Sequence, residues 1–171
     1  MNTFFKPVEV LAGTEHLNKC LSGEKTAMIS GCIDTQKVHM AQALSKNYRY
    51  NVIVTYDEAK AREMCEDAAF FNKNTVYYPA KDIIFYSADV HGNQIVAERL
   101  RCINKIIENE NASQEEENHL TVVTTIDAFA DMLIPVEVYK EACININKRS
   151  IINIDDFVKQ MVTLGYERNA L

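Results

Sequence analysis

Four short runs of apolar and β-branched residues stand out along the chain, at residues 26–30, 51–55, 75–78 and 120–125. Each run has the length of a β-strand, and each is too continuous for a strand that keeps one face in water. We therefore predict four strands that are covered on both faces, as the strands of a parallel sheet are.

The segments between these runs have the spacing of amphipathic helices. Residues 34–48 and 93–107 each place apolar side chains on one stripe of a helix. A Thr-x-x-Glu sequence at 55–58 has the pattern of a capping box, which predicts a helix from there through residue 71. Strands alternating with helices of this length are typical of βαβ units, so the predicted fold class is α/β with a parallel sheet. The stripe in 93–107 consists of Val96, Leu100, Ile103 and Ile107.

The helical pattern stops at residues 108–118, which contain five glutamates and no basic residue. We interpret this stretch as a solvated loop, and the alternative is an acidic segment that contacts a partner. The stretch carries most of the formal net charge of −6, so the rest of the chain is nearly neutral.

The predicted elements become shorter after residue 125. Helical patterns at 126–133 and 135–141 lead to an alternating run at 143–147, which predicts a strand with one buried face. Asn153 then has the position of a helix N-cap, and Gly165 has that of a left-handed residue that ends the helix.

The length of 171 residues fits one domain, or one domain with an appendage, at roughly 150 residues per domain. We predict a first α/β domain over residues 1–134. Residues 135–171 are expected to form a linker helix and the opening of a small α+β domain. One strand and one helix bury little apolar surface, so this second domain is expected to be incomplete.

Composition and charge limit the classes of function. With 47% hydrophobic and 25% charged residues, the chain has the composition of a packed globular protein. The negative net charge argues against a protein that grips duplex DNA by neutralising its phosphates. Five cysteines without a CxxC pair indicate neither a disulfide framework nor a zinc ribbon. With no signal-like start and no apolar run of membrane-spanning length, we expect a cytoplasmic protein.

A degenerate phosphate loop follows the first predicted strand. Gly31 and Lys37 have the spacing of the first glycine and the lysine of G-x-x-x-x-G-K-[ST]. Gln36 replaces the second glycine, Val38 replaces the hydroxyl residue that would hold Mg²⁺, and Asp34 adds a carboxylate to a cradle for anions. We therefore expect no cofactor to bind at these positions.

The alternative is a small nucleotide-binding enzyme with an unusual but working phosphate loop. Such an enzyme also needs an acidic residue after a strand to hold Mg²⁺. Asp57 and Asp127 are the plausible positions, and each also fits the start of a helix.

Other candidates for chemistry are weaker. His39 and Cys32 offer two metal ligands without a third at a recognisable spacing, so a half-buried histidine is the alternative. Aromatic residues near Lys81 allow a platform for single-stranded nucleic acid, but core and edge packing explains them as well. We predict no catalytic residue and no metal site. The aromatic residues are Tyr77, Tyr78, Phe85 and Tyr86, and the isolated histidines are His16, His91 and His119.

Four segments carry a family resemblance: 30–37, 52–59, 77–100 and 152–169. In this order they resemble the N-terminal, UvrB-like module of the bacterial transcription-repair coupling factor (Mfd), and the resemblance covers nearly the whole chain. The central block and the closing Gly-Tyr-Glu-Arg are its most specific parts. UvrB itself has an intact phosphate loop and a long DNA-clamping hairpin after its tyrosines, and this chain has neither.

The resemblance implies a first domain that corresponds to a RecA-like ATPase half without nucleotide binding, and a non-catalytic role for this chain. In the family, an ATP- and Mg²⁺-dependent motor elsewhere in the protein translocates on duplex DNA and releases stalled RNA polymerase, and the UvrB-like module recruits UvrA. The UvrA-contacting residues of the family follow the Gly-Tyr-x-Arg segment. We therefore expect them beyond Leu171, in a longer parent protein of which this chain is a fragment.

Overall fold

The computed structural model describes residues 3–81, 90–112, 119–144 and 146–167, and only the backbone of 90–93. The chain divides into two compact units, Met1–Asp131 (unit 1) and Met132–Leu171 (unit 2), and each is described by itself. Within the described residues, no helix combines the length and apolar character required to cross a membrane.

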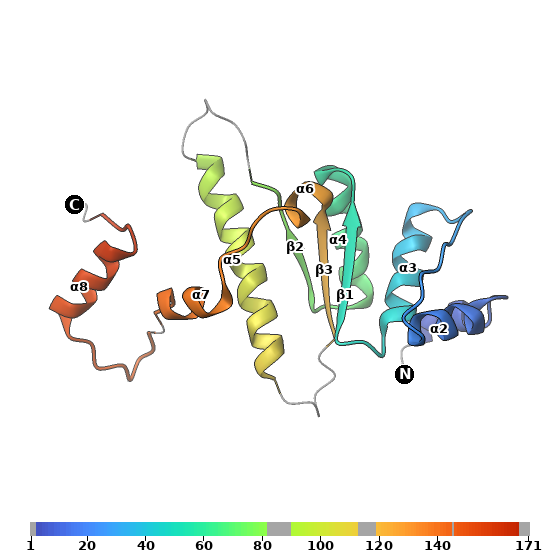
Figure 1. The fold of residues 1–171 in the computed structure, drawn as a ribbon, viewed down its shortest axis with the longest axis horizontal. Helices are drawn as coiled ribbons and strands as arrows, with labels where there is room; N and C mark the ends of the chain where they lie inside the picture. Colours follow the sequence, from blue (N-terminus) through green and yellow to red (C-terminus); the bar gives the residue numbers. More distant parts are fainter. Residues whose placement is uncertain (1–2, 82–89, 113–118, 145, 168–171) are drawn as a thin grey trace. The chain divides into compact units, whose positions relative to one another are not determined.

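Unit 1 is built on a three-stranded parallel sheet with the order β1-β3-β2 (Figure 1). Its strands are β1 (Tyr50–Thr55), β2 (Thr75–Tyr78) and β3 (Leu120–Thr125). Tyr50 is in register with Leu120, and Thr75 with Thr121. All six residues of the central strand β3 are buried. The predicted α/β class with a parallel sheet is confirmed, and so are three of the four predicted strands.

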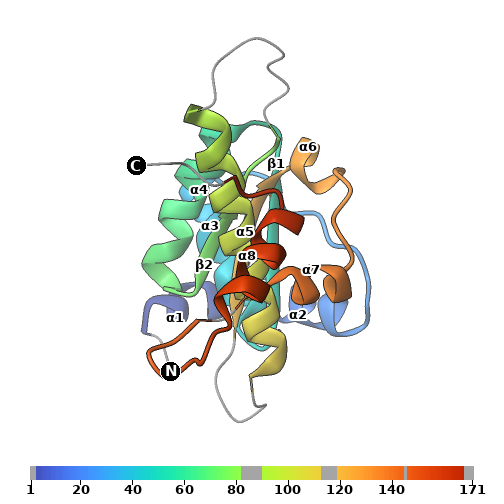
Figure 2. The same cartoon turned by 90° about the vertical axis from the view of Figure 1, so that its left-hand side faces the viewer.

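Helices cover both faces of the sheet. Helices α3 (Asp34–Ser45) and α4 (Glu58–Phe71) lie on one face, and α5 (Val90–Asn111) lies on the other (Figures 1 and 2). Each face therefore has its own apolar core. The core under α3 and α4 contains Val38, Ala61, Ala68 and Val123, and the core under α5 contains Tyr78, Cys102, Leu120, Val122 and Ala128.

The N-terminal segment forms a third, smaller core. It comprises a 3-10 turn η1 (Thr3–Phe5) and two helices, α1 (Lys6–Glu9) and α2 (Thr14–Ser22). Val8 of α1 packs against Met40 and Ala43 of α3. The segment thereby extends the covered surface of α3 away from the sheet.

The segment 26–30 is not a strand, which corrects the prediction. Met28 is 92% exposed and Ile29 is 44% exposed. The outer edges of β1 and β2 pair with no described strand, and no described backbone hydrogen bond ties 26–30 to either edge. The apolar composition of the segment predicted burial, but a strand also requires backbone hydrogen bonds to a neighbouring strand.

The start of α4 differs in detail from the predicted capping box at 55–58. The N-cap is Asp57, whose carboxylate accepts a hydrogen bond from the Lys60 N–H at 2.8 Å. The Glu58 carboxylate accepts instead from the N–H of Ala80, at 3.1 Å, and so ties the start of α4 to the end of β2. A tertiary contact has replaced the local one.

Helix α5 extends further than predicted, because 108–111 are helical rather than part of a loop. Asn109 is buried, and its carbonyl accepts a hydrogen bond from Arg49. The Tyr50 hydroxyl donates to Glu110. These contacts with the start of β1 hold the last turn of α5, and the acidic residues 115–117 lie outside the described residues.

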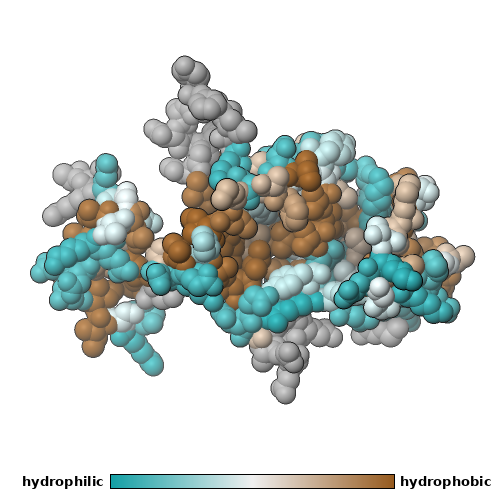
Figure 3. Space-filling view, viewed as in Figure 1, coloured by the Kyte–Doolittle hydropathy of each residue, from teal (hydrophilic) through white to brown (hydrophobic). Residues whose placement is uncertain are grey.

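Part of the α5 face of the sheet is open to solvent. Glu98 of α5 reaches Arg62 of α4 around the outer edge of β2, with 3.4 Å between Nη2 and Oε2. Leu100 is two residues further on, about 200° around the helix, and therefore lies toward β1. Leu100 is 42% exposed, and on β1 Val52 is 50% exposed and Val54 is 42% exposed. Figure 3 shows hydrophobic surface gathered over the strands and the adjoining side of α5.

Two short helices, one in each unit, follow β3 along the chain. In unit 1, α6 (Ile126–Phe129) is capped by Thr125, and it is shorter than the predicted helix 126–133. In unit 2, α7 (Val136–Ala142) begins directly after Pro135.

Unit 2 also contains α8 (Ile154–Thr163), whose predicted boundaries are confirmed. The Asn153 side chain accepts hydrogen bonds from two N–H groups of the first turn, and Gly165 has a φ of +87°. The described residues of 143–147 form no strand, which corrects that prediction. No residue of α7 or α8 is buried. A strand of this kind is stable only when it pairs with a sheet, and the described part of unit 2 contains no strand with which it could pair.

Candidate functional site

The degenerate phosphate loop leads directly into α3. Gly31 has a φ of +82°, a conformation that favours glycine, and a Cβ there would meet no atom within 4 Å. Asp34 is the first residue of α3, and the N-cap residue Ile33 makes no side-chain capping bond. The positive φ of the backbone at this turn is therefore sufficient to explain the glycine.

The lysine of the motif is paired within the protein. Lys37 Nζ lies 2.9 Å from Asp34 Oδ1, and Lys60 Nζ of α4 lies 2.7 Å from the other oxygen, Oδ2. Lys60 also contacts Glu63 Oε2 at 2.8 Å. Two lysines and two carboxylates thus form one cluster whose formal charges cancel.

These contacts shift the titration of the cluster. The hydrogen bond from Lys37, followed by that from Lys60, lowers the pKa of Asp34 to about 2. The pKa of Lys60 is raised, first by its hydrogen bond to Asp34 and then by that to Glu63. Asp34 and Lys60 are therefore both charged at neutral pH.

The two remaining motif positions have separate roles. Gln36 is exposed on the first turn of α3. Val38 is fully buried in the core under α3 and α4, where it packs with Ala61 and Val123. A hydroxyl residue of a working loop would face a metal ion from this position, whereas here the side chain contributes to the core.

The two acidic residues that an enzyme would need for Mg²⁺ lie at helix starts. Asp57 caps α4, as described above. Asp127 lies exposed in the first turn of α6, which Thr125 caps. Within the described residues, no three His, Cys, Asp or Glu side chains are grouped to hold a metal ion.

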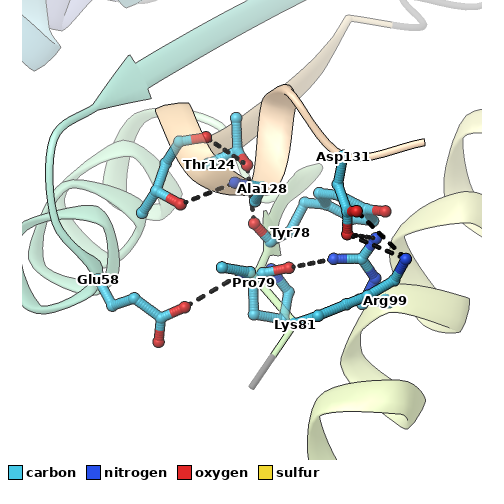
Figure 4. Close-up of polar contacts among 10 residues, drawn as sticks. Glu58, Tyr78, Pro79, Lys81, Arg99, Thr124, Ala128 and Asp131 are labelled. Atoms are coloured by element: carbon cyan, nitrogen blue, oxygen red, sulfur yellow. Dashed lines mark hydrogen bonds and ion pairs between the residues drawn. The ribbon is translucent and has the colours of Figure 1, made fainter. Parts of the chain in front are cut away.

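A second polar cluster lies at the carboxyl end of β2, and it was not found from the sequence (Figure 4). Arg99 of α5 is only 7% exposed. Its Nη1 donates to the Pro79 carbonyl at 2.8 Å, and its Nη2 to Asp131 Oδ2 at 2.9 Å. Lys81 also contacts Asp131, at 3.2 Å, and its hydrogen bond is the main cause of a lowered pKa of Asp131. The Arg99 guanidinium stacks on the Tyr78 ring, 4.3 Å from its centre.

The tyrosines of β2 are part of the packed interior, which confirms the packing interpretation. Tyr78 is buried, and one face of its ring is covered by Arg99. The Tyr77 ring is covered by Arg62 at 4.6 Å, and burial together with the charge of Glu58 raises the pKa of Tyr77 to about 12. These ring faces are therefore not free to stack on bases.

The histidine candidates have structural contacts. The His39 ring stacks on Phe71 with 4.8 Å between ring centres, and its Nε2 lies 2.7 Å from the Phe4 carbonyl. The sulfur of Cys32 contacts Met40 at 3.6 Å. His119 Nδ1 lies 2.6 Å from the Tyr48 carbonyl, and His16 Nε2 lies 3.5 Å from the sulfur of Cys20. Phe85, Tyr86 and the side chain of His91 lie outside the described residues.

Comparisons with known proteins give one consistent result. No protein-family model and no solved structure matches the chain. A curated protein of Bacillus subtilis (strain 168) is 24% identical over 156 residues, which are 90% of this chain and 13% of the relative. Relatives from Staphylococcus epidermidis and Staphylococcus haemolyticus are 21% and 20% identical over 152 residues, 87% of this chain and 12% of each relative.

All three relatives are named transcription-repair-coupling factor. The chain thus spans 12 to 13% of the length of the curated relatives that it matches, while the alignment takes in most of its own residues. The resemblance seen in the sequence is confirmed: this chain is similar, over 87 to 90% of its length, to bacterial transcription-repair-coupling factors.

Proposed function

We propose that this chain is a non-catalytic, UvrB-like module of a bacterial transcription-repair coupling factor. The similarity to proteins of that name over 87 to 90% of the chain is the observation that carries the proposal. The α/β fold with a parallel sheet is compatible with an ATPase-like half domain.

The charges at the phosphate loop support the non-catalytic part of the proposal. A phosphate-binding loop presents an uncompensated lysine to its ligand. Here Lys37 and Lys60 are both paired with Asp34, and Val38 is part of the core. In this proposal, ATP and Mg²⁺ bind a motor in another part of the parent protein.

In this proposal the parent works in the cytoplasm. It translocates on duplex DNA, releases RNA polymerase stalled at a lesion and brings UvrA to the site for nucleotide excision repair. The role of the UvrB-like module is recruitment, with the UvrA-contacting surface in its second domain.

The test uses the full-length product of the gene from which this chain comes. We expect that product to release stalled RNA polymerase with ATP and to retain purified UvrA. Removing the whole UvrB-like module, residues 1–171 together with the rest of its second domain, should abolish UvrA retention and leave ATP-driven release intact, so release serves as the folding control. A gene that ends at codon 171, or UvrA retention that survives the deletion, would contradict the proposal.

A further inference from the structure

The Asp34 carboxylate contacts two lysines that come from different helices. Lys37 is on α3, one turn after Asp34, and Lys60 is on α4. The two ammonium groups lie 2.9 and 2.7 Å from the two different oxygens of the carboxylate. A single anion thus bridges two cations, as a phosphate group does when two basic side chains bind it.

The carboxylate lies in the first turn of α3, a position that favours a bound anion. The first turn of a helix favours an anion, because its N–H groups have no partners within the helix. Asp34 is the residue that opens α3, directly after the turn at Gly31. The lysine with motif spacing, Lys37, is paired with this carboxylate, whereas the lysine of a working loop binds phosphate.

We propose that the Asp34 carboxylate is an internal anion that occupies the Lys37 and Lys60 cation pair in place of a phosphate group and so keeps the loop closed to phosphate ligands. The contact is autoinhibitory toward anions and at the same time ties α3 to α4. This inference rests on the non-catalytic part of the proposed function, which uses the same ion pairs, and it is independent of the recruitment of UvrA.

Competition explains why an internal carboxylate excludes a free anion. A group tethered one turn from its partner has an effective concentration in the millimolar range or above, on the order of that reached by short linkers. A free phosphate group must therefore compete with the tethered carboxylate for both lysines. Asp34→Asn removes the charge and keeps the shape of the side chain, which leaves two lysines with Glu63 alone and a local formal charge of +1.

The experiment measures binding of inorganic pyrophosphate by isothermal titration calorimetry at low salt. We expect Asp34→Asn to bind pyrophosphate severalfold, up to about tenfold, more tightly than the unmodified chain, because two exposed ion pairs no longer compete for the lysines. Adding Lys37→Met to that variant should abolish the gain. Asp127→Asn is the matched control, because it removes one carboxylate from the first turn of another helix and should leave binding unchanged.

Each other outcome counts against the inference. Equal binding by the unmodified chain and Asp34→Asn would show that the carboxylate does not compete with phosphate. A gain of the same size in Asp127→Asn would show an effect of net charge only. If Asp34→Asn fails to fold by circular dichroism, Asp34→Ser replaces it, since serine is favoured at helix starts. Absence of binding in a folded variant would overturn the inference.

Discussion

Restoring the hydroxyl residue of the phosphate-loop motif should destabilise the protein rather than create a metal site. Val38 has no exposed surface and packs under α3 and α4. Val38→Thr keeps the volume and buries a hydroxyl, which costs about 1–3 kcal/mol. Val38→Ala removes two methyl groups at roughly 0.8 kcal/mol each and leaves a cavity, for a total of about 2–3 kcal/mol.

The assay is urea unfolding followed by circular dichroism, together with the Tm in the presence and absence of Mg·ATP. A loss of about 2 kcal/mol lowers Tm by roughly 4–8 °C for a domain of this size. Val96→Thr is the matched control, since this valine is 54% exposed on α5, and we expect a change within about 0.5 kcal/mol. A Val38→Thr variant as stable as the control, or one that Mg·ATP stabilises, would refute the assignment of Val38 to the core.

Three further predictions concern the polar cluster of α5, the reactivity of the thiols and the stability of the protein at acidic pH. Arg99→Met leaves a buried backbone carbonyl without a donor and should cost about 2 kcal/mol in urea unfolding, against little change for the exposed neighbour in Arg101→Met. Burial raises the pKa of Cys102 to about 12, so iodoacetamide at pH 8 should label the exposed Cys143 and spare Cys102 in mass spectrometry. The pKa of Asp34 lies near 2 in the folded protein against 3.8 for a free side chain. The ionised carboxylate therefore adds to the free energy of unfolding in full above about pH 4, and this stabilisation is lost as the pH falls toward 2. In Asp34→Asn, the free energy of unfolding should accordingly fall less between about pH 4 and pH 2 than in the unmodified chain. An unchanged fall over that range would contradict the pairing.

The three sheet strands could be predicted from the sequence because their signal is local. Runs of β-branched residues such as 120–125 have few alternatives to a strand that is covered on both faces. The segment 26–30 shows where that reasoning ends: its composition resembles that of the others, but no described backbone hydrogen bond joins it to the sheet. Strand order depends on contacts between residues far apart in the chain, which a local pattern does not contain.

The candidate site was predictable in part for a similar reason. The spacing of three between Asp34 and Lys37 is visible in the sequence and fits an ion pair on one helix face. Lys60 comes from the next helix, and nothing local indicates that it shares the same carboxylate. Arg99 was missed because an arginine in a helix is usually exposed. Its spacing in the sequence indicated burial, since Arg99 lies one helical turn before Cys102, and both residues are buried on the same side of α5.

The central place of β3 has a consequence for the order of folding. Neither β1 nor β2 pairs with any described strand except β3, which is the last of the three to be synthesised. About 65 residues separate the end of β1 from the start of β3, which corresponds to roughly 3–13 s of translation at 5–20 residues per second. During that interval β1 and β2 have no partner from the native sheet, so a ribosome-bound chain that ends at residue 118 should be cleaved rapidly by proteases. A chain that carries residues 120–131 clear of the ribosome should resist cleavage, and nascent unit 1 is thus expected to gain its sheet in a single late step.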